Sequence, residues 1–334
     1  MKLFWFGLIV CMVVFVASLL YLISKPLPEI ESVSGTTNSL GNVLSRPDQA
    51  EDGDRTRPLR IGLVPERDVF AQHKRYQVLG DYLGERLGCR VQLRTSISYQ
   101  AVLADLEDGS IDAAFLGSLV AALAIDRYGA KPIARPVLAN NVSTYRGVLF
   151  VPTDSPITSV QGLAGRTVAG VQATTAGCLF PLAMIRQAGI GIGTGREPQF
   201  RWVGTHDDVL LEVLSGRVEA GAAKDLRLDA LLAARESDDS PIRILAVSDK
   251  MPNNALLVSA SMDSAVSNRL FETLTTMSEF ERGATVLSSF GAVRFIPCSE
   301  SEYRPVYDFV GQIGTDWVLT GIPGPAPRRS AVRG

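Results

Sequence analysis

Between residues 59 and 319 the chain alternates short apolar runs with longer segments in which apolar side chains recur every three or four positions. Short apolar runs are typical of buried strands, and the longer recurrence is typical of helices with one buried face. The expected strands are 59–64, 90–93, 111–116, 147–151, 168–171, 200–203, 218–222, 242–247 and 256–258. The expected helices are 76–87, 99–106, 119–128, one that ends at 185, 207–214, 226–234, 265–281 and 302–313. This order predicts parallel βαβ units and an α/β fold.

The strands and helices form two series, which run from 59 to 128 and from 168 to 234. Two apolar strands, 147–151 and 242–247, lie between and after these series. We therefore predict two lobes joined by paired crossings of the chain. Lobe 1 is expected to comprise residues 59–144 and 249–320, and lobe 2 residues 145–248, including the crossover strands.

The N-terminal segment is a long apolar stretch, since Leu3–Ile23 contains 21 residues without a charge. A helix of that length spans about 30 Å, the thickness of the hydrocarbon core of a bilayer. A cleaved signal peptide is the alternative, but it needs a shorter apolar stretch and a small-residue cleavage site, which is missing after Ile23. We expect residues 1–25 to be a transmembrane anchor or an uncleaved signal, with the globular part outside the cytoplasm, in the periplasm.

Two further segments lack apolar periodicity. Residues 26–58 are rich in Ser, Gly, Asn and Pro and contain the acidic run Glu51–Asp54, and residues 321–334 are rich in Pro and Gly. Such segments bury too little surface to offset the entropy lost on ordering. We predict a flexible linker at 26–58 and a disordered tail at 321–334.

Charge and composition exclude several function classes. The chain has 33 Lys and Arg against 35 Asp and Glu, a formal charge of -2, which excludes a globally basic nucleic-acid-binding surface. The four Cys form no CxxC pair, and two His leave little room for a His-rich metal site. The Gly-rich stretch Gly189–Gly195 follows an expected helix instead of opening one, so it is read as a helix end and not as a nucleotide loop. We expect no cofactor, no metal and no nucleic-acid partner.

Six motifs in order give the chain a family resemblance. They are Arg60–Pro65, Ser98–Val102, Gly109–Gly117, Tyr145–Val151 followed by Asp154–Ile157, Ala173–Gly177 with Pro181, and Val203–Val209. Together they resemble the phosphate-, phosphite- and phosphonate-binding proteins that serve ABC importers. The resemblance implies a two-lobed type II periplasmic-binding-protein fold, with a mixed sheet and flanking helices in each lobe. It also implies that the lobes close on a ligand held between them.

The segment Thr174–Gly177 has the chemistry of an oxyanion site. It lies between an expected strand and the start of a helix, where free backbone N–H groups and hydroxyls meet the positive end of the helix dipole. The resemblance assigns Thr174, Thr175 and Ala176 to the ligand. The family pattern is Ser-Thr-Ser-Gly followed by an aromatic residue, so Ala176 and Cys178 depart from it and one hydroxyl is lost. An ordinary helix cap is the alternative for the threonines.

Other candidate residues follow the ends of expected strands, the edge at which α/β proteins bind ligands. His206 opens a helix and can donate to an anion; a surface histidine is the alternative. Tyr99 begins a helix where the family places an aromatic contact from lobe 1, and half-buried packing is the alternative. Gly117 and Ser118 begin another helix, whose N–H groups can hold an anion. Tyr145 precedes the first crossing and is expected to touch either the ligand or the hinge.

Asp225 follows the strand 218–222 and matches an acidic position of the family. A carboxylate there can accept a hydrogen bond from a protonated oxyanion or from the amino group of an aminophosphonate, and it would repel a fully ionised phosphate. A helix cap before Leu226 is the equally weighted alternative.

The residues and the resemblance predict a membrane-tethered extracytoplasmic solute-binding protein that delivers a phosphorus oxyanion or phosphonate to an ABC permease. The alternative is a sensing or accessory domain that signals ligand occupancy to a membrane partner. The sequence contains no activated nucleophile, no catalytic carboxylate pair and no metal cluster, so we expect no enzymatic activity.

Overall fold

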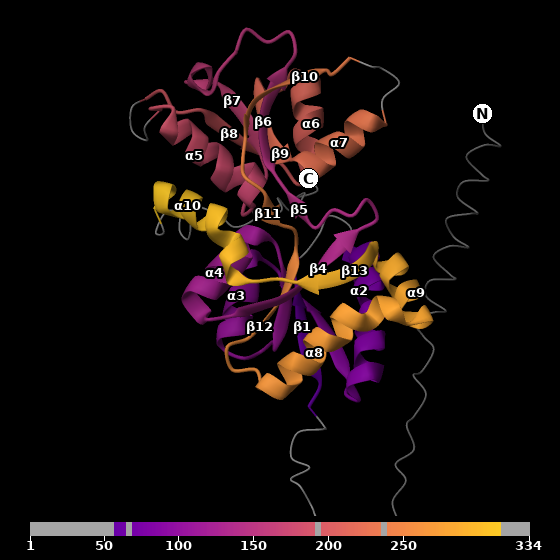
Figure 1. Cartoon of the computed structure of the whole chain (residues 1–334). Coiled ribbons are helices and arrows are strands. Elements are labelled where there is room, and N and C mark those ends of the chain that lie inside the picture. Colours follow the sequence, from indigo (N-terminus) through magenta and orange to yellow (C-terminus); the bar gives the residue numbers. More distant parts are fainter. Residues whose placement is uncertain (1–56, 65–68, 191–194, 235–238, 315–334) are drawn as a thin grey trace, which may run out of the picture. The chain divides into compact units, whose positions relative to one another are not determined.

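A computed structural model describes residues 57–64, 69–190, 195–234 and 239–314 (Figure 1). The expected anchor at 1–25, most of the linker at 26–58 and the tail at 321–334 lie outside the described residues. Within these ranges, no helix is both long and apolar enough to cross a membrane.

Lobe 1 is built on a sheet in which the described strands follow the order β13-β4-β12-β3-β1-β2. The strands are β1 (Leu59–Leu63), β2 (Val91–Thr95), β3 (Ala113–Leu116), β4 (Lys131–Leu138), β12 (Ala255–Val258) and β13 (Ala292–Pro297). Its helices are α2 (Val69–Leu87), α3 (Tyr99–Glu107), α4 (Ser118–Tyr128), α8 (Ser264–Thr276) and α9 (Glu281–Phe290). Strands β1, β2 and β3 are parallel, as the βαβ pattern predicts. Their carboxyl ends therefore meet at one edge of the sheet.

Lobe 2 is built on a second sheet, in the order β10-β6-β9-β7-β8 among the described strands. These are β6 (Gly147–Pro152), β7 (Thr167–Gly170), β8 (Gln199–Trp202), β9 (Ala220–Lys224) and β10 (Ile242–Val247). Its helical segments are η1 (Val160–Leu163), the π-helix η2 (Thr175–Leu179), α5 (Phe180–Gln187), α6 (His206–Leu214) and α7 (Asp225–Ala233). Strands β7, β8 and β9 are parallel, so their carboxyl ends also share one edge.

The chain crosses between the lobes at two short antiparallel strands, β5 (Thr144–Tyr145) and β11 (Met251–Pro252) (Figure 1). The two apolar strands expected at the crossings, β6 and β10, pair with each other inside the lobe 2 sheet. The sheet of lobe 1 contains strands from before and after lobe 2, so the two lobes are interleaved in sequence.

Three features of lobe 1 differ from the sequence expectations. Strands β4 and β13 were not expected, and β4 contains Pro132 and Pro136, which are unusual inside a sheet because they donate no hydrogen bond. Helix α2 begins at Val69 instead of residue 76. The single helix expected at 265–281 is interrupted by η3 (Met277–Glu279), after which the backbone of Phe280 is extended.

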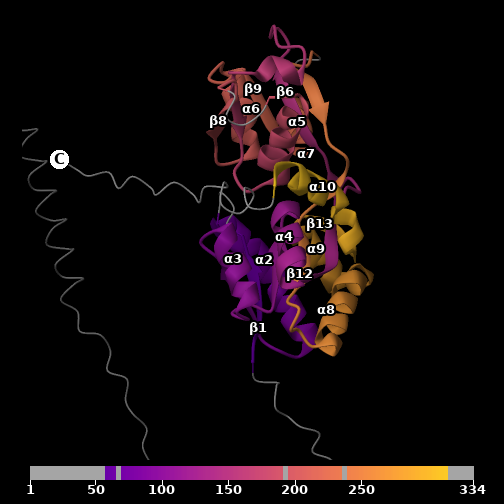
Figure 2. The same ribbon diagram turned by 90° about the vertical axis from the view of Figure 1, so that its left-hand side faces the viewer.

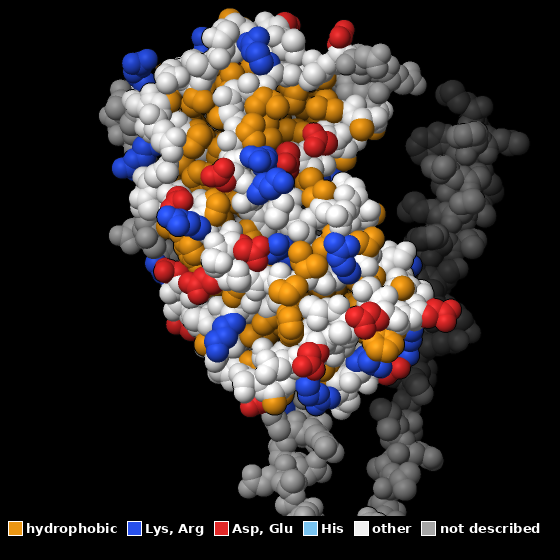
Figure 3. Space-filling view, viewed as in Figure 1, with side chains coloured by type: hydrophobic (Ala, Val, Ile, Leu, Met, Phe, Trp, Pro, Cys, Tyr) orange, Lys and Arg blue, Asp and Glu red, His pale blue; other side chains and the backbone are white. Residues whose placement is uncertain are grey.

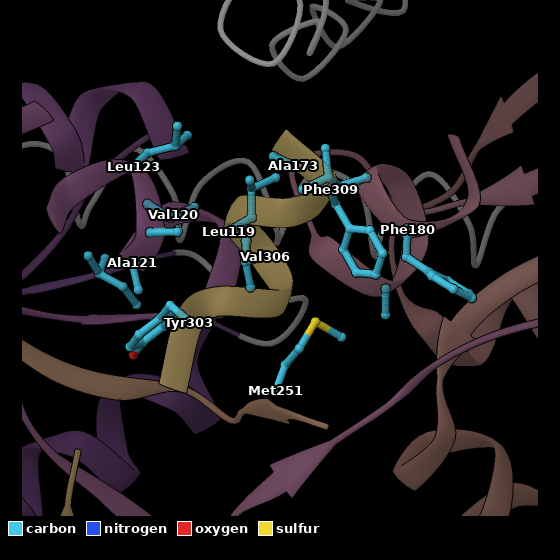
Figure 4. Packing of buried hydrophobic residues seen from close by; sticks show 14 of the residues in the cluster. Leu119, Val120, Ala121, Leu123, Ala173, Phe180, Met251, Tyr303, Val306 and Phe309 are labelled. Atoms are coloured by element: carbon cyan, nitrogen blue, oxygen red, sulfur yellow. The ribbon is translucent and has the colours of Figure 1, made fainter. Parts of the chain in front are cut away.

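A helix near the C-terminal end of the described chain joins the apolar cores of the two lobes. It consists of η4 (Glu300–Tyr303) and α10 (Arg304–Ile313), which packs against α4 of lobe 1 and α5 of lobe 2 (Figure 2). Its buried side chains are Tyr303, Val306, Phe309 and Ile313. The ring centroids of Phe309 and Phe180 lie 5.7 Å apart (Figure 4). Residues from both lobes thus belong to one continuous buried cluster.

The edge strand β10 leaves apolar side chains at the surface. Ile244 and Val247 are exposed there, and Figure 3 shows apolar side chains gathered over this lobe. Neither residue lines the cavity described below. The exposed apolar surface and the candidate site are therefore separate features of lobe 2.

Candidate functional site

A cavity of about 520 Å³ opens between the two lobes, at the carboxyl-terminal edges of their parallel strands. Its lining residues are Val64, Gln72, Tyr76, Tyr99, Phe115, Gly117, Ser118 and Leu119 from lobe 1, Tyr145 and Asn254 beside the crossings, and Val171, Ala173, Thr174, Thr175, Gly204, Thr205, His206, Asp207, Lys224 and Arg227 from lobe 2. This is the position at which open α/β sheets bind ligands.

The loop between β7 and η2 carries two threonine hydroxyls: that of Thr175 is at the cavity, and that of Thr174 forms hydrogen bonds within the loop. Thr174 Oγ1 donates to the Val171 carbonyl at 2.8 Å and accepts from the Gly177 N–H at 3.1 Å. Thr175 lines the cavity, and its buried Oγ1 makes no hydrogen bond of normal geometry to the described residues, although it interacts with the nearby Tyr145 hydroxyl. A buried hydroxyl without a partner is costly, so Thr175 is the group best placed to receive a ligand oxygen.

The backbone of the same loop is tightly packed. A Cβ atom on Gly170 would lie 2.2 Å from the Gly177 carbonyl oxygen, and one on Gly177 would lie 2.7 Å from the Val171 nitrogen. Ala173 has a φ of 55°, in the left-handed region that a residue with a Cβ rarely adopts. Strained backbone of this kind is concentrated at binding sites, where the surrounding structure holds it in place.

The N–H groups of Thr175 and Ala176 are in the first turn of η2, where a helix offers them no internal acceptor. The Ala176 side chain is fully buried and is not among the lining residues. The assignment of Ala176 to the ligand stays a prediction. The hydroxyl expected from the family pattern at this residue is absent.

His206 is the first residue of α6 and lines the cavity. Its Nδ1 is buried without a hydrogen-bond partner. Burial, followed by the nearby positive charge of Lys224, lowers the pKa of His206 to about 3. The imidazole is consequently neutral at physiological pH, and it can offer one N–H donor to a ligand.

On the lobe 1 side, the side chains of Tyr145 and Ser118 and the Pro252 carbonyl form a buried chain of hydrogen bonds. Ser118 Oγ donates to the Pro252 carbonyl at 3.1 Å, so the Tyr145 hydroxyl must be the donor in the 2.5 Å contact between the two side chains. Burial raises the pKa of Tyr145, while the neighbouring hydroxyls of Ser118 and Thr175 act in the opposite direction. Both side-chain protons are used within the protein, which leaves the N-terminal N–H groups of α4, after Gly117, for a ligand.

Tyr99 lines the cavity as the first residue of α3, where the N-cap Ser98 accepts a hydrogen bond from Ala101 N. Tyr76 of α2 also lines it, and packs edge-on against Phe115 with ring centroids 5.1 Å apart. The lobe 1 wall thus carries the aromatic residues Tyr76, Tyr99 and Phe115, whereas most of the lobe 2 lining residues are polar.

Asp225 is not among the residues that line the cavity. Its Oδ1 accepts hydrogen bonds from Arg146 N at 2.9 Å and from Leu226 N at 2.8 Å. The carboxylate therefore ties the start of α7 to the strand that enters lobe 2. Asp225 is the first residue of α7, whose N-cap is Lys224, so the expected cap role is not seen in this form. The assignment of Asp225 to the ligand stays a prediction.

Among the described residues, three charged ones line the cavity without having been assigned to it from the sequence: Lys224, Arg227 and Asp207. Arg227 forms a two-pronged ion pair with Asp207, in which Nε donates to Oδ1 at 2.8 Å. The position of Lys224 after the apolar run 218–222, at the ligand edge of the sheet, was the signal that could have identified it. No comparable signal exists for Arg227, which reaches the cavity from within α7.

Comparison with known proteins agrees with this architecture. Residues 61–303, more than half of the chain, match the family described as the periplasmic substrate-binding protein of phosphonate ABC transporters. A probable phosphite-binding protein of an ABC transporter from Prochlorococcus marinus is 19% identical, over 74% of this chain and 87% of its own length. The phosphonates-binding periplasmic protein of Escherichia coli is 20% identical, over 80% of this chain and 79% of its own length.

Solved structures show the same fold. XAC2383 from Xanthomonas citri, in a chloride-bound form, superposes with a TM-score of 0.68 at 21% identity, over 79% of this chain and 99% of its own. The Prochlorococcus marinus protein PhnD1 in complex with methylphosphonate gives 0.62 at 18% identity, over 76% and 97% of the two chains. The chain thus has the type II periplasmic-binding-protein fold, and it belongs to the family of periplasmic substrate-binding proteins of phosphonate ABC transporters.

Proposed function

We propose that this protein binds a phosphorus oxyanion (a phosphonate, phosphite or phosphate) between its lobes and delivers it to an ABC permease. The observation that carries the proposal is the buried hydroxyl of Thr175, which has no partner and lines a cavity at the start of a helical segment. The names of the two curated relatives, one for phosphite and one for phosphonates, support the same ligand class.

The donors are distributed as a tetrahedral anion requires. In lobe 2 the Thr175 hydroxyl, the N–H groups that begin η2 and the neutral His206 can each donate to a ligand oxygen. In lobe 1 the N–H groups that begin α4 and the Tyr99 side chain lie on the facing wall. A ligand that bonds to both walls stabilises the closed arrangement of the lobes more than the open one, which is how binding drives hinge closure.

We also propose that residues 1–25 tether the protein to the cytoplasmic membrane, with the binding lobes in the periplasm. The uncharged stretch Leu3–Ile23 supports this proposal because its length matches the hydrocarbon core. A tether keeps the binding lobes close to a membrane-embedded permease, which raises their effective concentration there.

Transport is tested by deleting the gene in the bacterium that carries it and measuring uptake of radiolabelled methylphosphonate, phosphite and phosphate. We expect uptake of at least one of the three to fall, and to recover with the parent gene but not with a Thr175→Val copy. Unchanged uptake of all three would contradict the transport role. The family match favours this role over the sensing alternative.

A further inference from the structure

Two hydroxyl groups fasten both crossings of the chain to lobe 1. The Tyr145 hydroxyl, on the first crossing β5, donates to Ser118 Oγ at 2.5 Å, and Ser118 is the first residue of α4 in lobe 1. Ser118 Oγ donates in turn to the carbonyl of Pro252, on the second crossing β11, at 3.1 Å. Tyr145, Ser118 and Pro252 are all buried. One serine of lobe 1 therefore holds both crossings where they pair with each other (Figure 1).

The residues next to these contacts are fastened to lobe 2. Arg146 N donates to Asp225 Oδ1 at 2.9 Å, and Asp225 N, at the start of α7, donates to the Arg146 carbonyl at 3.0 Å. On the way back, Gly147 N donates to Ser248 Oγ at 2.8 Å, and Ser248 N donates to the Gly147 carbonyl at 2.9 Å. The first crossing thus changes from lobe 1 partners to lobe 2 partners between Tyr145 and Arg146.

The Tyr145 hydroxyl also has the proposed ligand-binding hydroxyl as a neighbour. Thr175 of lobe 2 interacts with it, and both residues line the cavity. Because the Tyr145 proton is donated to Ser118, the Tyr145 oxygen can only accept from Thr175. A ligand oxygen that accepts from Thr175 competes with this interaction. The Tyr145 hydroxyl therefore lies between the proposed ligand contact of lobe 2 and the helix α4 of lobe 1.

Fixing the crossing on both sides of one peptide bond limits where the lobes can turn. Without the hydrogen bond from Tyr145 to Ser118, the crossing could turn at more than one residue, and the lobes would sample a wider range of separations. Thr175 and the N–H groups that begin α4 would then be at the separation that one ligand can bridge for a smaller fraction of the time. The affinity falls in proportion to that fraction, whichever ligand is bound.

We infer that Tyr145 is a positioning residue for ligand binding: its hydrogen bond to Ser118 confines the pivot of the lobes to the step from Tyr145 to Arg146. It acts on the ligand through Thr175 and α4, whose separation it controls. The effect on affinity rests on the proposed function, because it assumes that a ligand bridges Thr175 and the start of α4. The position of the pivot does not depend on that assumption.

The separation of the lobes is measured as the distance between two spin labels, by double electron–electron resonance on the full chain purified in detergent. The labels are attached at Ala104→Cys in α3 of lobe 1 and at Leu211→Cys in α6 of lobe 2, two exposed helix positions that do not line the cavity. All proteins compared carry Cys11→Ser and Cys89→Ser, and the other two cysteines are buried. The distribution of distances then reports how widely the lobes move.

Tyr145→Phe removes the hydroxyl and keeps the ring, whose centre lies 4.2 Å from Lys224 Nζ. Without added ligand we expect a wider distribution of label distances than in the parent, a change that loss of a ligand contact cannot produce. Ser118→Ala should widen it at least as much, and adding Tyr145→Phe to it should widen it no further, because the two side chains share one hydrogen bond. In calorimetric titrations with methylphosphonate, phosphite and phosphate, each ligand that binds the parent should bind Tyr145→Phe about threefold to tenfold more weakly, as expected for one neutral hydrogen bond.

The matched control is Tyr82→Phe, because Tyr82 is a buried tyrosine of α2 that does not line the cavity; it should leave both the distances and the affinities unchanged. Unchanged distances in Tyr145→Phe and Ser118→Ala would overturn the inference, as would equal widening in Tyr82→Phe. Wider distances with unchanged affinities would overturn the positioning role and leave the proposed function standing. If none of the three ligands binds the parent, the proposed ligand class fails, while the distances still decide where the lobes pivot.

Discussion

The hydroxyls of Thr174 and Thr175 make different hydrogen bonds, although the sequence analysis assigned both residues to the ligand. The Thr174 hydroxyl donates one hydrogen bond and accepts another within the loop itself. Thr175 has a buried oxygen without a partner. The difference is set by loop geometry, which depends on the φ of Ala173 and on the close approach of Gly170 and Gly177.

This contrast predicts opposite effects for two substitutions. Thr175→Val should weaken ligand binding by about 1–3 kcal/mol, the cost of a lost buried hydrogen bond, and leave the stability of the unliganded protein equal or higher. Thr174→Val should lower the free energy of unfolding by about 1 kcal/mol through the lost cap. Calorimetry and urea denaturation measure the two quantities, and an unchanged dissociation constant for Thr175→Val would show that its hydroxyl is not a donor.

His206 predicts a pH dependence of stability. Its pKa in the folded protein is about 3, below the usual 6.5, because burial and Lys224 disfavour the charged imidazole. As the pH falls from 6.5 toward 3 the unfolded chain gains a proton that the folded chain does not, so stability contributed by the neutral imidazole is lost in this window.

The measurement is urea denaturation of the parent and of His206→Asn at pH 7, 6, 5 and 4. The free energy of unfolding should fall more steeply with decreasing pH in the parent than in the variant. Parallel profiles for the two proteins would mean that the imidazole is not held neutral by its surroundings.

At the scale of elements, the positions of the candidate site were predictable and its side-chain directions were not. The starts of η2, α4, α3 and α6 follow strand ends, so the sequence places Gly117 and Tyr99 at the carboxyl-terminal edge of one sheet, and Thr175 and His206 at that of the other. Whether a side chain at such a place turns to the cavity depends on local partners. The Asp225 carboxylate accepts hydrogen bonds from two backbone N–H groups instead of lining the cavity. No spacing of residues in the sequence indicates these hydrogen bonds.

Strands with an unbroken apolar run were predicted from the sequence, and strands with an interrupted run were not. Strands β3 and β6 are almost wholly buried, and their continuous apolar residues made them predictable. Strand β4 was missed because prolines and the buried Arg135, which pairs with Glu302, break its apolar pattern. Long-range pairing of that kind is set by tertiary contacts and leaves no local signal.

The packing of β7 against η2 predicts that Gly170→Ala is damaging. The new methyl group would collide with the Gly177 carbonyl, so the loop must shift, at a cost of about 1–3 kcal/mol in stability and with weaker ligand binding. The control is Gly311→Ala in α10, where the new Cβ would have no described atom within 4 Å apart from its chain neighbours and the backbone of its own helix. That change should be neutral or stabilise by up to about 1 kcal/mol. Equal stability of the two variants would contradict the close packing.

At the scale of the whole molecule, the lobes are joined both by the crossings at β5 and β11 and by the apolar packing of α10 (Figure 4). The ligand cavity opens between the same two lobes. Movement of the lobes is therefore expected to pivot about the crossings while the α10 cluster stays packed. The sequence predicted this helix, because its apolar positions recur at helical spacing, but it did not predict that the helix packs against both lobes.

The proposed tether predicts where the protein is found. Deleting residues 1–25 should move the protein from the membrane fraction to the soluble periplasmic fraction when a cleavable export signal replaces them. Its affinity for ligand should stay within about twofold of the parent, because these residues lie before the lobes. A deleted protein that still sediments with membranes would show that another segment attaches it.

The proposed function depends most on the binding of an anion at the Thr175 loop. The direct measurement is isothermal titration of the full chain and of Thr175→Val with phosphite, phosphate and methylphosphonate. We predict that the parent binds one ligand per chain for at least one of the three, and that the variant binds it about tenfold or more weakly, the equivalent of about 1.4 kcal/mol. Absence of binding by the parent at millimolar ligand, or equal binding by both proteins, would contradict it.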